Sequence, residues 1–162
     1  MFRNVASTAL TLIAMGAVLS GSNTALAVIT SQATGKGAID FEDGASASLQ
    51  FKAGEDALGN VYGEVQFWFK EPGGEENFGV HGTVTCYMLL NDTTVVFGGI
   101  VDHSTDPELE GTAFTAVVVD GEPVGEPDAF FIGGSDEPCS FFEPDLATPI
   151  DRGNIVVHVI KE

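Results

Sequence analysis

The sequence predicts an all-β protein, a single antiparallel domain of about eight strands folded as a sandwich or a small barrel. Three observations lead to this fold class. Runs rich in Val, Phe, Ile and Thr recur along the chain, apolar and polar residues alternate within them, and Gly, Pro and Asp separate them. Such alternation is typical of half-buried antiparallel strands, and many short strands separated by turns pack as sandwiches or barrels.

The first 27 residues have the pattern of a signal peptide. Arg3 supplies the positive charge, residues 9–19 form an apolar run, and Ala25-Leu26-Ala27 is a small-x-small cleavage site. The alternative is an uncleaved amphipathic anchor. A transmembrane helix needs about 20 apolar residues, more than this run contains. We therefore expect no transmembrane segment, a mature domain of residues 28–162, and a secreted, periplasmic or cell-envelope location.

Eight strands are predicted in order. The segment that precedes them, residues 28–36, is rich in Thr, Ser, Gln and Gly, and we expect a loose N-terminus there. Asp43-Gly44 is the signal for a tight turn between the first two strands. The predicted strands are residues 38–43, 45–53, 61–70, 82–90, 93–104, 112–120, 129–132 and 154–160.

The third strand has the most regular alternation. Val61, Gly63, Val65, Phe67 and Phe69 share its apolar face. Trp68 and Tyr62 then lie on the wetter face. They could form a platform for a carbohydrate or a peptide, but an aromatic cross-strand pair or a cover over a second sheet is the more frequent arrangement and the one we expect.

Residues 82–104 form the central hairpin, with a break at Asn91-Asp92. Alternation places Val84, Cys86, Met88 and Leu90 on one face, which we expect to point into the core. Two consecutive glycines in the second strand, residues 98–99, predict a bulge or a close approach of backbones.

Cys86 and Cys139 are the two cysteines of the chain, and an even count in an exported protein predicts a disulfide. The bond would enclose a long loop and stabilise the fold by about 4 kcal/mol. It would also pin the irregular segment 133–153, so that Phe141-Phe142 plug the core. A redox or metal pair is the alternative, although no Cys-x-x-Cys spacing supports it.

The formal charge is −18, and every Asp and Glu follows Ala27. Such acidity argues against nucleic acid and anionic membrane surfaces as partners, because both attract Lys and Arg patches. It favours solubility and permits cation binding. We expect a monomer whose partner is a protein, a glycan or a small molecule.

One acidic turn is the candidate ligand site. It contains Asp120, Glu122, Glu126 and Asp128, and its glycines allow a tight path. Calcium takes six to eight oxygen ligands and favours such loops. The alternative, which we prefer, is a solvated turn whose carboxylates bind the local backbone, with no cofactor.

No residue is assigned a catalytic role, and we expect a protein that is not an enzyme. The nucleophile-elbow, P-loop and dinucleotide-binding motifs do not occur in the sequence. His81, His103 and His158 have no metal-ligand spacing, so we expect surface histidines and not a zinc site.

The sequence contains a set of short segments: Gly79-Val-His-Gly82-Thr-Val-Thr-Cys86, Gly98-Gly99-Ile-Val, Val-Val-Asp120-Gly-Glu-Pro-Val-Gly, Asp128, Cys139 and Gly153-Asn154-Ile-Val-Val-His158. Together they resemble a group of small secreted β-rich proteins of uncharacterised function, frequent in actinobacteria. The resemblance covers about residues 36–160. The family often has an Asp-Asn-Gly turn where this chain has Asp120-Gly121. The resemblance implies export, one β domain and the cysteine pair, and implies no catalytic residue.

Three functions follow as hypotheses. The first is an exported, non-enzymatic binding or structural module of the extracellular space or cell envelope. The second is a barrel that carries a small apolar ligand in a pocket lined by Phe51, Phe67, Phe69 and Met88, and the third is a small secreted hydrolase. An apolar cavity of about 300 Å³ or more would favour the carrier, and a filled interior would favour the module.

Overall fold

The computed structural model describes residues 29–73, 77–140 and 144–160; the predicted signal peptide lies outside them. Within the described residues, one antiparallel sheet has nine strands in the order β8-β7-β6-β5-β4-β3-β2-β1-β9. The predicted all-β fold is confirmed. The strands are β1 (Ile29–Asp40), β2 (Ser46–Asp56), β3 (Val61–Lys70), β4 (Asn77–Asn91), β5 (Thr94–Ser104), β6 (Ala113–Val119), β7 (Ala129–Ser135), β8 (Thr148–Pro149) and β9 (Arg152–Val159).

Helical structure in the described part of the chain is confined to three single turns of 3₁₀ helix, Pro107–Leu109, Glu122–Val124 and Pro144–Leu146. No helix among these residues has the length and apolar character needed to cross a membrane.

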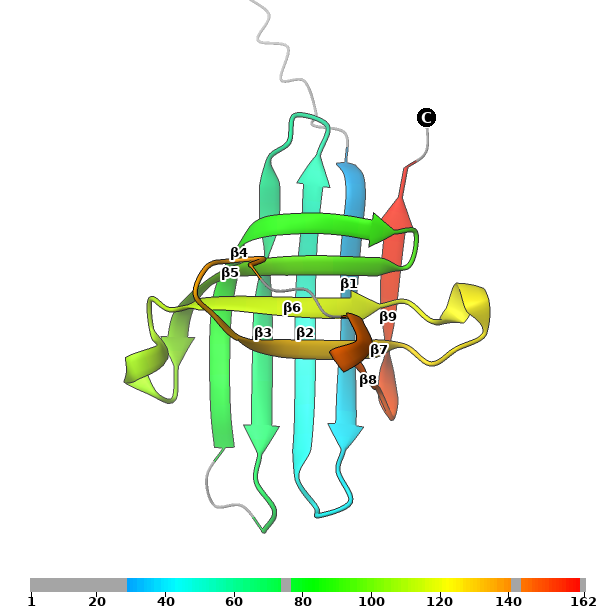
Figure 1. Ribbon diagram of the computed structural model, residues 1–162. Helices are drawn as coiled ribbons and strands as arrows, with labels where there is room; N and C mark the ends of the chain where they lie inside the picture. The colour runs from blue at the N-terminus through cyan, green and yellow to red at the C-terminus, as the bar shows by residue number, and fades with distance from the viewer. Residues whose placement is uncertain (1–28, 74–76, 141–143, 161–162) are drawn as a thin grey trace, which may run out of the picture.

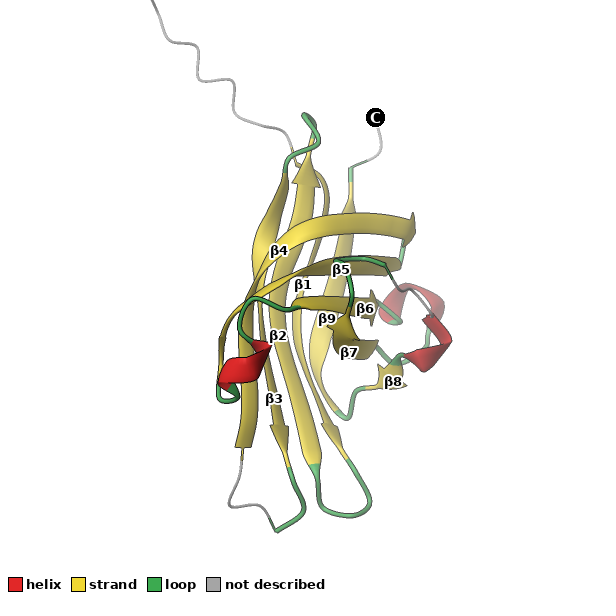
Figure 2. Cartoon of the chain, turned by 60° about the vertical axis from the view of Figure 1, so that its left-hand side comes forward, coloured by secondary structure: helices red, strands yellow, loops and turns green. Residues whose placement is uncertain are grey.

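The sheet curls over on itself into a half-barrel of two layers (Figure 1). The back layer consists of β9, β1, β2, β3, the start of β4 and the last residues of β5, which pair with it. The front layer consists of β6, β7 and the remainder of β4 and β5, and its strands cross those of the back layer. Figure 2 shows β4 and β5 bending from one layer into the other. The core lies between the layers, and the outer face of the back layer is open to solvent.

The bend occurs at bulges between β4 and β5. Residues 77–83 of β4 pair with β3, whereas the remainder of β4 pairs with β5 alone. The register shifts between His81 and Gly82 and again between Val84 and Cys86. A Cβ at Gly99 would collide with the Thr83 carbonyl oxygen. The bulge predicted from the two glycines is therefore confirmed, and it requires glycine at position 99.

The second bulge reverses the faces predicted for β4. Val84 and Tyr87 face the core, whereas Cys86 and Met88 pack on the outer side of the front layer and Leu90 is exposed. The prediction that Val84, Cys86, Met88 and Leu90 share a core-facing side was wrong beyond Val84. A bulge adds one residue, and so turns every later side chain to the opposite face.

A disulfide joins Cys86 and Cys139, as predicted, with 6.1 Å between the Cα atoms. It lies on the outer side of the front layer and not in the core. Gly98 admits the incoming segment, because a Cβ there would be 2.6 Å from the Cys139 amide nitrogen. The expected plug, Phe141-Phe142, lies outside the described residues. A small apolar cluster surrounds the bond and consists of Val96, Val117, Cys139, Cys86 and Met88.

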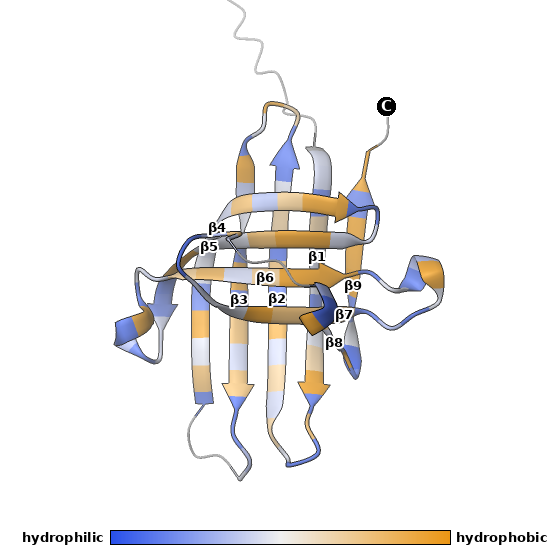
Figure 3. Cartoon of the chain, in the orientation of Figure 1, coloured by the Kyte–Doolittle hydropathy of each residue, from blue (hydrophilic) through white to orange (hydrophobic). Residues whose placement is uncertain are grey.

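The two layers enclose an apolar core. The rings of Phe51 from the back layer and Phe97 from the front layer stack with centroids 5.1 Å apart. Strands β5 and β6 each contain six consecutive buried residues, because the core covers one side and the Cys139 segment the other. Figure 3 shows the same contrast, with β5 to β7 mostly apolar and the back-layer strands alternating. The buried core residues are Ala33, Ile39, Ala47, Leu49, Phe51, Ala53, Val65, Val84, Tyr87, Val95, Phe97, Val101, Phe114, Ala116, Val118, Phe130 and Ile155.

The predicted loose N-terminus is wrong for residues 29–36, which form most of β1. This segment pairs with β2 on one side and with β9 on the other. Ser31 and Ala33 are buried. A Cβ at Gly35 would be 2.5 Å from the Asn154 carbonyl oxygen, so glycine allows β9 to approach closely. The polar composition reflects the outward-facing half of the strand, which remains in water.

Two buried carboxylates fasten the free edge of β9 to the β6–β7 connection. The Ile155 amide donates to Oδ2 of Asp128 over 2.7 Å, and the Val157 amide donates to Oδ2 of Asp120 over 2.9 Å. Oδ1 of Asp128 also accepts from the Gly121 amide. Both carboxylates are 6% exposed. Two amides at the open edge of β9 are thus bonded to carboxylate side chains, whereas in a closed barrel the backbone of a neighbouring strand would accept these hydrogen bonds.

Asp128→Asn should destabilise the protein by about 1–3 kcal/mol. Each oxygen of Asp128 accepts a hydrogen bond from one buried backbone N–H group. The asparagine NH₂ group replaces one of these oxygens and cannot accept, so one N–H group is left unpaired. Asp120→Asn should destabilise the protein less, because Asp120 accepts one hydrogen bond from β9, from the Val157 amide, and the remaining oxygen of asparagine can still accept it. Urea unfolding measures both. Glu126→Gln removes the same charge from the exposed part of this turn and should have little effect; an equal loss there would show that the β9 contacts are not responsible.

Tyr87→Phe should change how stability depends on pH. Burial raises the pKa of Tyr87, and the hydrogen bond with Ser31, at 2.6 Å, lowers it in part. The buried, neutral Tyr87 therefore contributes its full share of the folding free energy below the usual tyrosine pKa of about 10. This contribution falls as the pH rises above about 10, because the unfolded state then loses its tyrosine proton more readily than the folded state does. Urea unfolding at pH 8 and pH 10.5 should show a smaller loss for Tyr87→Phe than for the parent. Equal losses would contradict this role.

Candidate functional site

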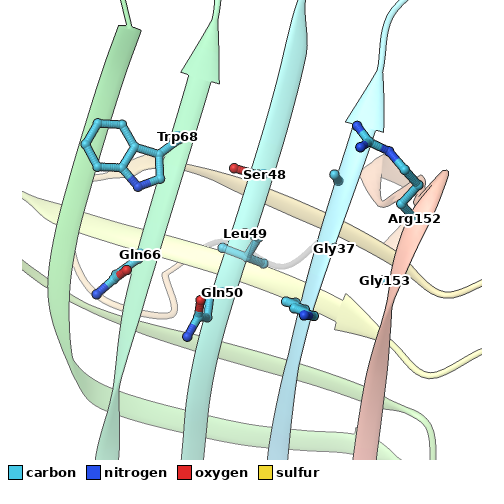
Figure 4. A pocket seen from close by; sticks show the side chains of 10 residues that line it. Gly37, Ser48, Leu49, Gln50, Gln66, Trp68, Arg152 and Gly153 are labelled. Atoms are coloured by element: carbon cyan, nitrogen blue, oxygen red, sulfur yellow. The ribbon is translucent and has the colours of Figure 1, made fainter.

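The outer face of the back layer carries a surface hollow. Its volume is about 330 Å³, and it crosses β9, β1, β2 and β3 (Figure 4). The hollow exists because small residues of β1 and β2, such as Ala38 and Ser48, do not fill it. Longer polar side chains surround it. The lining residues are Lys36, Gly37, Ala38, Ser48, Leu49, Gln50, Gln66, Trp68, Arg152 and Gly153.

Trp68 stands at one end of this hollow and is 51% exposed. It pairs directly with Gly79 on β4, and a Cβ at Gly79 would collide with the indole ring. The indole therefore lies over the glycine. Tyr62, also on β3, lies in the same way over Gly54 of β2, the neighbouring strand on the other side. The prediction that both aromatic residues lie on the wetter face is confirmed, but each covers a glycine and they do not form a cross-strand pair.

A second hollow of about 290 Å³ adjoins the other side of Trp68. It lies over β3, β4 and the end of β5. Trp68 and Gln66 line both hollows, so the indole separates two depressions on one continuous face. The lining residues of this second hollow are Gln66, Trp68, Gly79, Val80, His81, His103, Ser104 and Thr105.

The outer face has a charge unlike that of the rest of the protein. The four basic residues in the described part of the chain, Lys36, Lys52, Lys70 and Arg152, all occupy outward positions of the back layer. Arg152 donates to Asp40 at the end of β1 over 2.8 Å. Most described carboxylates lie in turns and loops. In a chain with a net charge of −18, the described basic residues are thus gathered on one face, which also carries the carboxylates of Asp40, Glu64 and Asp102.

The histidines do not meet at one point. His81 and His103 lie side by side with ring centroids 6.4 Å apart, while His158 is on β9, with three strands between β9 and β4. Nε2 of His81 is 3.7 Å from Glu64, and its Nδ1 is 3.6 Å from Asp102. His81 thus faces two carboxylates at the edge of the second hollow.

Tyr62 and Asp56 are neighbours at the far end of the face. Burial, followed by the nearby Asp56 charge, raises the pKa of Tyr62, whose hydroxyl donates to Gln32. The Asn60 side-chain amide, followed by the Asn60 backbone N–H, lowers the pKa of Asp56. Asp56 therefore stays ionised and holds the β2–β3 turn.

The acidic turn predicted as a calcium site is divided between two roles. Asp120 and Asp128 point inward to β9, whereas Glu122 and Glu126 are exposed. Glu122, Glu126 and Asp128 do border a hollow of about 220 Å³. In the described residues, however, no three His, Cys, Asp or Glu side chains are close enough to hold a metal ion. That this turn binds calcium weakly or not at all stays a prediction.

Comparison with protein-family models, with curated proteins and with solved structures finds no match to this chain. Its function must therefore be inferred from the geometry of the outer face. Sequence reasoning placed Trp68 there but missed both hollows and the gathering of basic residues. Alternation along β1, β2 and β3 shows which of their side chains share the outer face. It does not show that β9 pairs with β1 and so brings Arg152 beside Lys36.

Gly79→Ala should push the indole of Trp68 off β4. Trp68 is the single tryptophan of the chain, so the intrinsic emission reports this side chain alone. We expect a shift to longer wavelength and faster quenching by acrylamide, because the indole gains exposure to water. Gly54→Ala is the matched control, since it displaces Tyr62 and leaves Trp68 in place. Unchanged emission in folded Gly79→Ala would mean that the ring does not rest on this glycine.

Proposed function

We propose that this protein is an exported, non-enzymatic binding module that holds an extended polysaccharide on the outer face of its back layer. A single observation carries this function: a half-exposed tryptophan stands between two shallow hollows lined by amide, hydroxyl and basic side chains. Sugars combine apolar C–H faces with many hydroxyl groups, and both features find partners here.

Trp68 supplies the apolar contact. An aromatic ring offers a large, rigid surface at low conformational cost, and its face attracts the slightly positive C–H groups of a sugar ring. Gly79 supports the indole from below, which keeps its solvent-facing side flat and in place. A sugar ring can therefore stack on Trp68 without ordering a flexible side chain.

Gln50 and Gln66 supply the polar contacts beside the indole. Each amide group both donates and accepts hydrogen bonds, as a sugar hydroxyl does. Ser48 adds a hydroxyl on the same face. Such neutral groups can bind a hydroxyl-rich ligand without the large desolvation cost of buried charges.

The two hollows together favour a chain of sugars over a single unit. They extend from Arg152 on β9 to Thr105 at the end of β5, across six neighbouring strands. Strands are about 4.8 Å apart, so the face spans roughly 24 Å at right angles to them. A ligand lying across the strands would contact Trp68 at its centre and one hollow on either side.

The other two hypotheses find less support. A carrier pocket was expected between Phe51, Phe67, Phe69 and Met88, but Met88 packs on the opposite side of the front layer from the core. A hydrolase needs a nucleophile within hydrogen-bond reach of a base. His81 instead faces Glu64 and Asp102.

The signal-peptide pattern and the Cys86–Cys139 disulfide support export, because disulfides persist in oxidising compartments.

Binding can be tested by calorimetry with hexamers of β-1,4-linked glucose and of β-1,4-linked N-acetylglucosamine and with a soluble uronate polymer. At least one should bind, and Trp68→Ala should weaken that binding tenfold or more, a loss of about 1.4 kcal/mol. Trp68→Phe should retain part of the affinity. Tyr62→Ala, on the same strand and also over a glycine, is the matched control outside both hollows.

Two results would contradict the proposed function. One is the absence of binding to all three saccharides by the folded parent protein. The other is an equal loss of affinity in Trp68→Ala and Tyr62→Ala, which would indicate a general effect on the sheet.

A further inference from the structure

A separate apolar cavity of about 140 Å³ lies at one end of the core, between the two layers. The back layer contributes residues from β3, the start of β4 and the end of β5, and the front layer contributes the start of β6 and the end of β7. The rim reaches solvent, because Thr112 and Gly134 are exposed. The lining residues are Val65, Phe67, Phe78, Val80, Gly82, Val101, Leu109, Thr112, Ala113, Phe114, Ile132, Gly133 and Gly134.

The chemistry of the lining is uniform. Three phenylalanines, Phe67, Phe78 and Phe114, border the cavity, and none of its lining residues is charged. Its single polar side chain, Thr112, already donates its hydroxyl hydrogen to the Leu109 carbonyl oxygen over 2.6 Å. No lining side chain therefore requires a polar partner from a ligand.

Gly134 explains why the space exists. It pairs directly with Phe114 on β6, and a Cβ built on Gly134 meets no atom within 4 Å. Phe114 faces the core, and directly paired residues share a face, so a side chain at position 134 would point into the cavity. A larger residue there would fill it.

We propose that this cavity binds a small uncharged molecule with one aromatic ring. An apolar cavity of about 150 Å³ lined by Leu, Ile and Phe stays dry and accepts benzene in another protein. Three phenylalanines favour an aromatic guest, because rings gain from offset and edge-to-face contacts. The space is too small for the drug-sized ligands of pockets of about 300 Å³ or more. The cavity shares Val80 with the lining of the second hollow, but Trp68 and the amide side chains of the proposed polysaccharide site do not line it.

Fluorobenzene is a suitable probe, since fluorine NMR reports its binding to the full mature protein directly. We expect saturable binding to the parent and a loss of at least tenfold in Gly134→Leu, whose side chain occupies the space. Trp68→Ala should bind fluorobenzene as the parent does, which separates this site from the outer face. Fluorobenzoate should bind at least tenfold more weakly, because its charge would be buried without a partner.

Two outcomes would overturn the proposal. One is the absence of saturable binding by the parent up to the solubility limit of fluorobenzene. The other is parent-like affinity in a folded cavity-filling variant. If Gly134→Leu does not fold, Ile132→Phe narrows the cavity from β7 and takes its place in the same comparison, with circular dichroism to establish folding.

Discussion

The bend in β4 and β5 is the constraint on which the rest of the structure depends. These two strands serve both layers, so their hydrogen-bond ladder must change direction without breaking. The bulge at Val84–Cys86 and the absence of a side chain at Gly99 make this possible. One consequence is that the front layer folds over the back layer and encloses the core. Another is that Cys86 turns outward, which moves the disulfide to the outer surface of the front layer.

Much of the fold could be predicted because local rules decide it. The third strand was predicted with the bounds of β3, and the central hairpin, the Gly98-Gly99 bulge and the cysteine pair are all confirmed. The direction of Cys86 could not be predicted, because alternation shows that a strand exists but not where one extra residue interrupts it. Residues 29–36 were missed for a related reason: β9, more than a hundred residues away, provides the second partner that makes a polar segment a strand.

The candidate site shows the same division. Alternation along β3 placed Trp68 on the wet face, but the hollows beside it arise from residues on neighbouring strands whose register is a property of the whole sheet. The acidic turn is the reverse case. Four clustered carboxylates suggested a cation site, and two of them instead bind the amides of β9. Composition alone does not distinguish a carboxylate that can bind a cation from one that accepts hydrogen bonds from the backbone of an edge strand.

The pairing of the first strand with the last has a consequence for how this chain reaches its native state. Ser31 pairs with Val159, so β1 keeps one open edge until the final strand is free to add to it. Until then Asp120 and Asp128 also lack the amides of β9 that they bind. Contacts between such distant residues form slowly, since a long loop must close first. A nascent chain therefore cannot complete its back layer before the last strand is synthesised, and such a delay would suit the proposed export, in which the chain crosses a membrane before it folds.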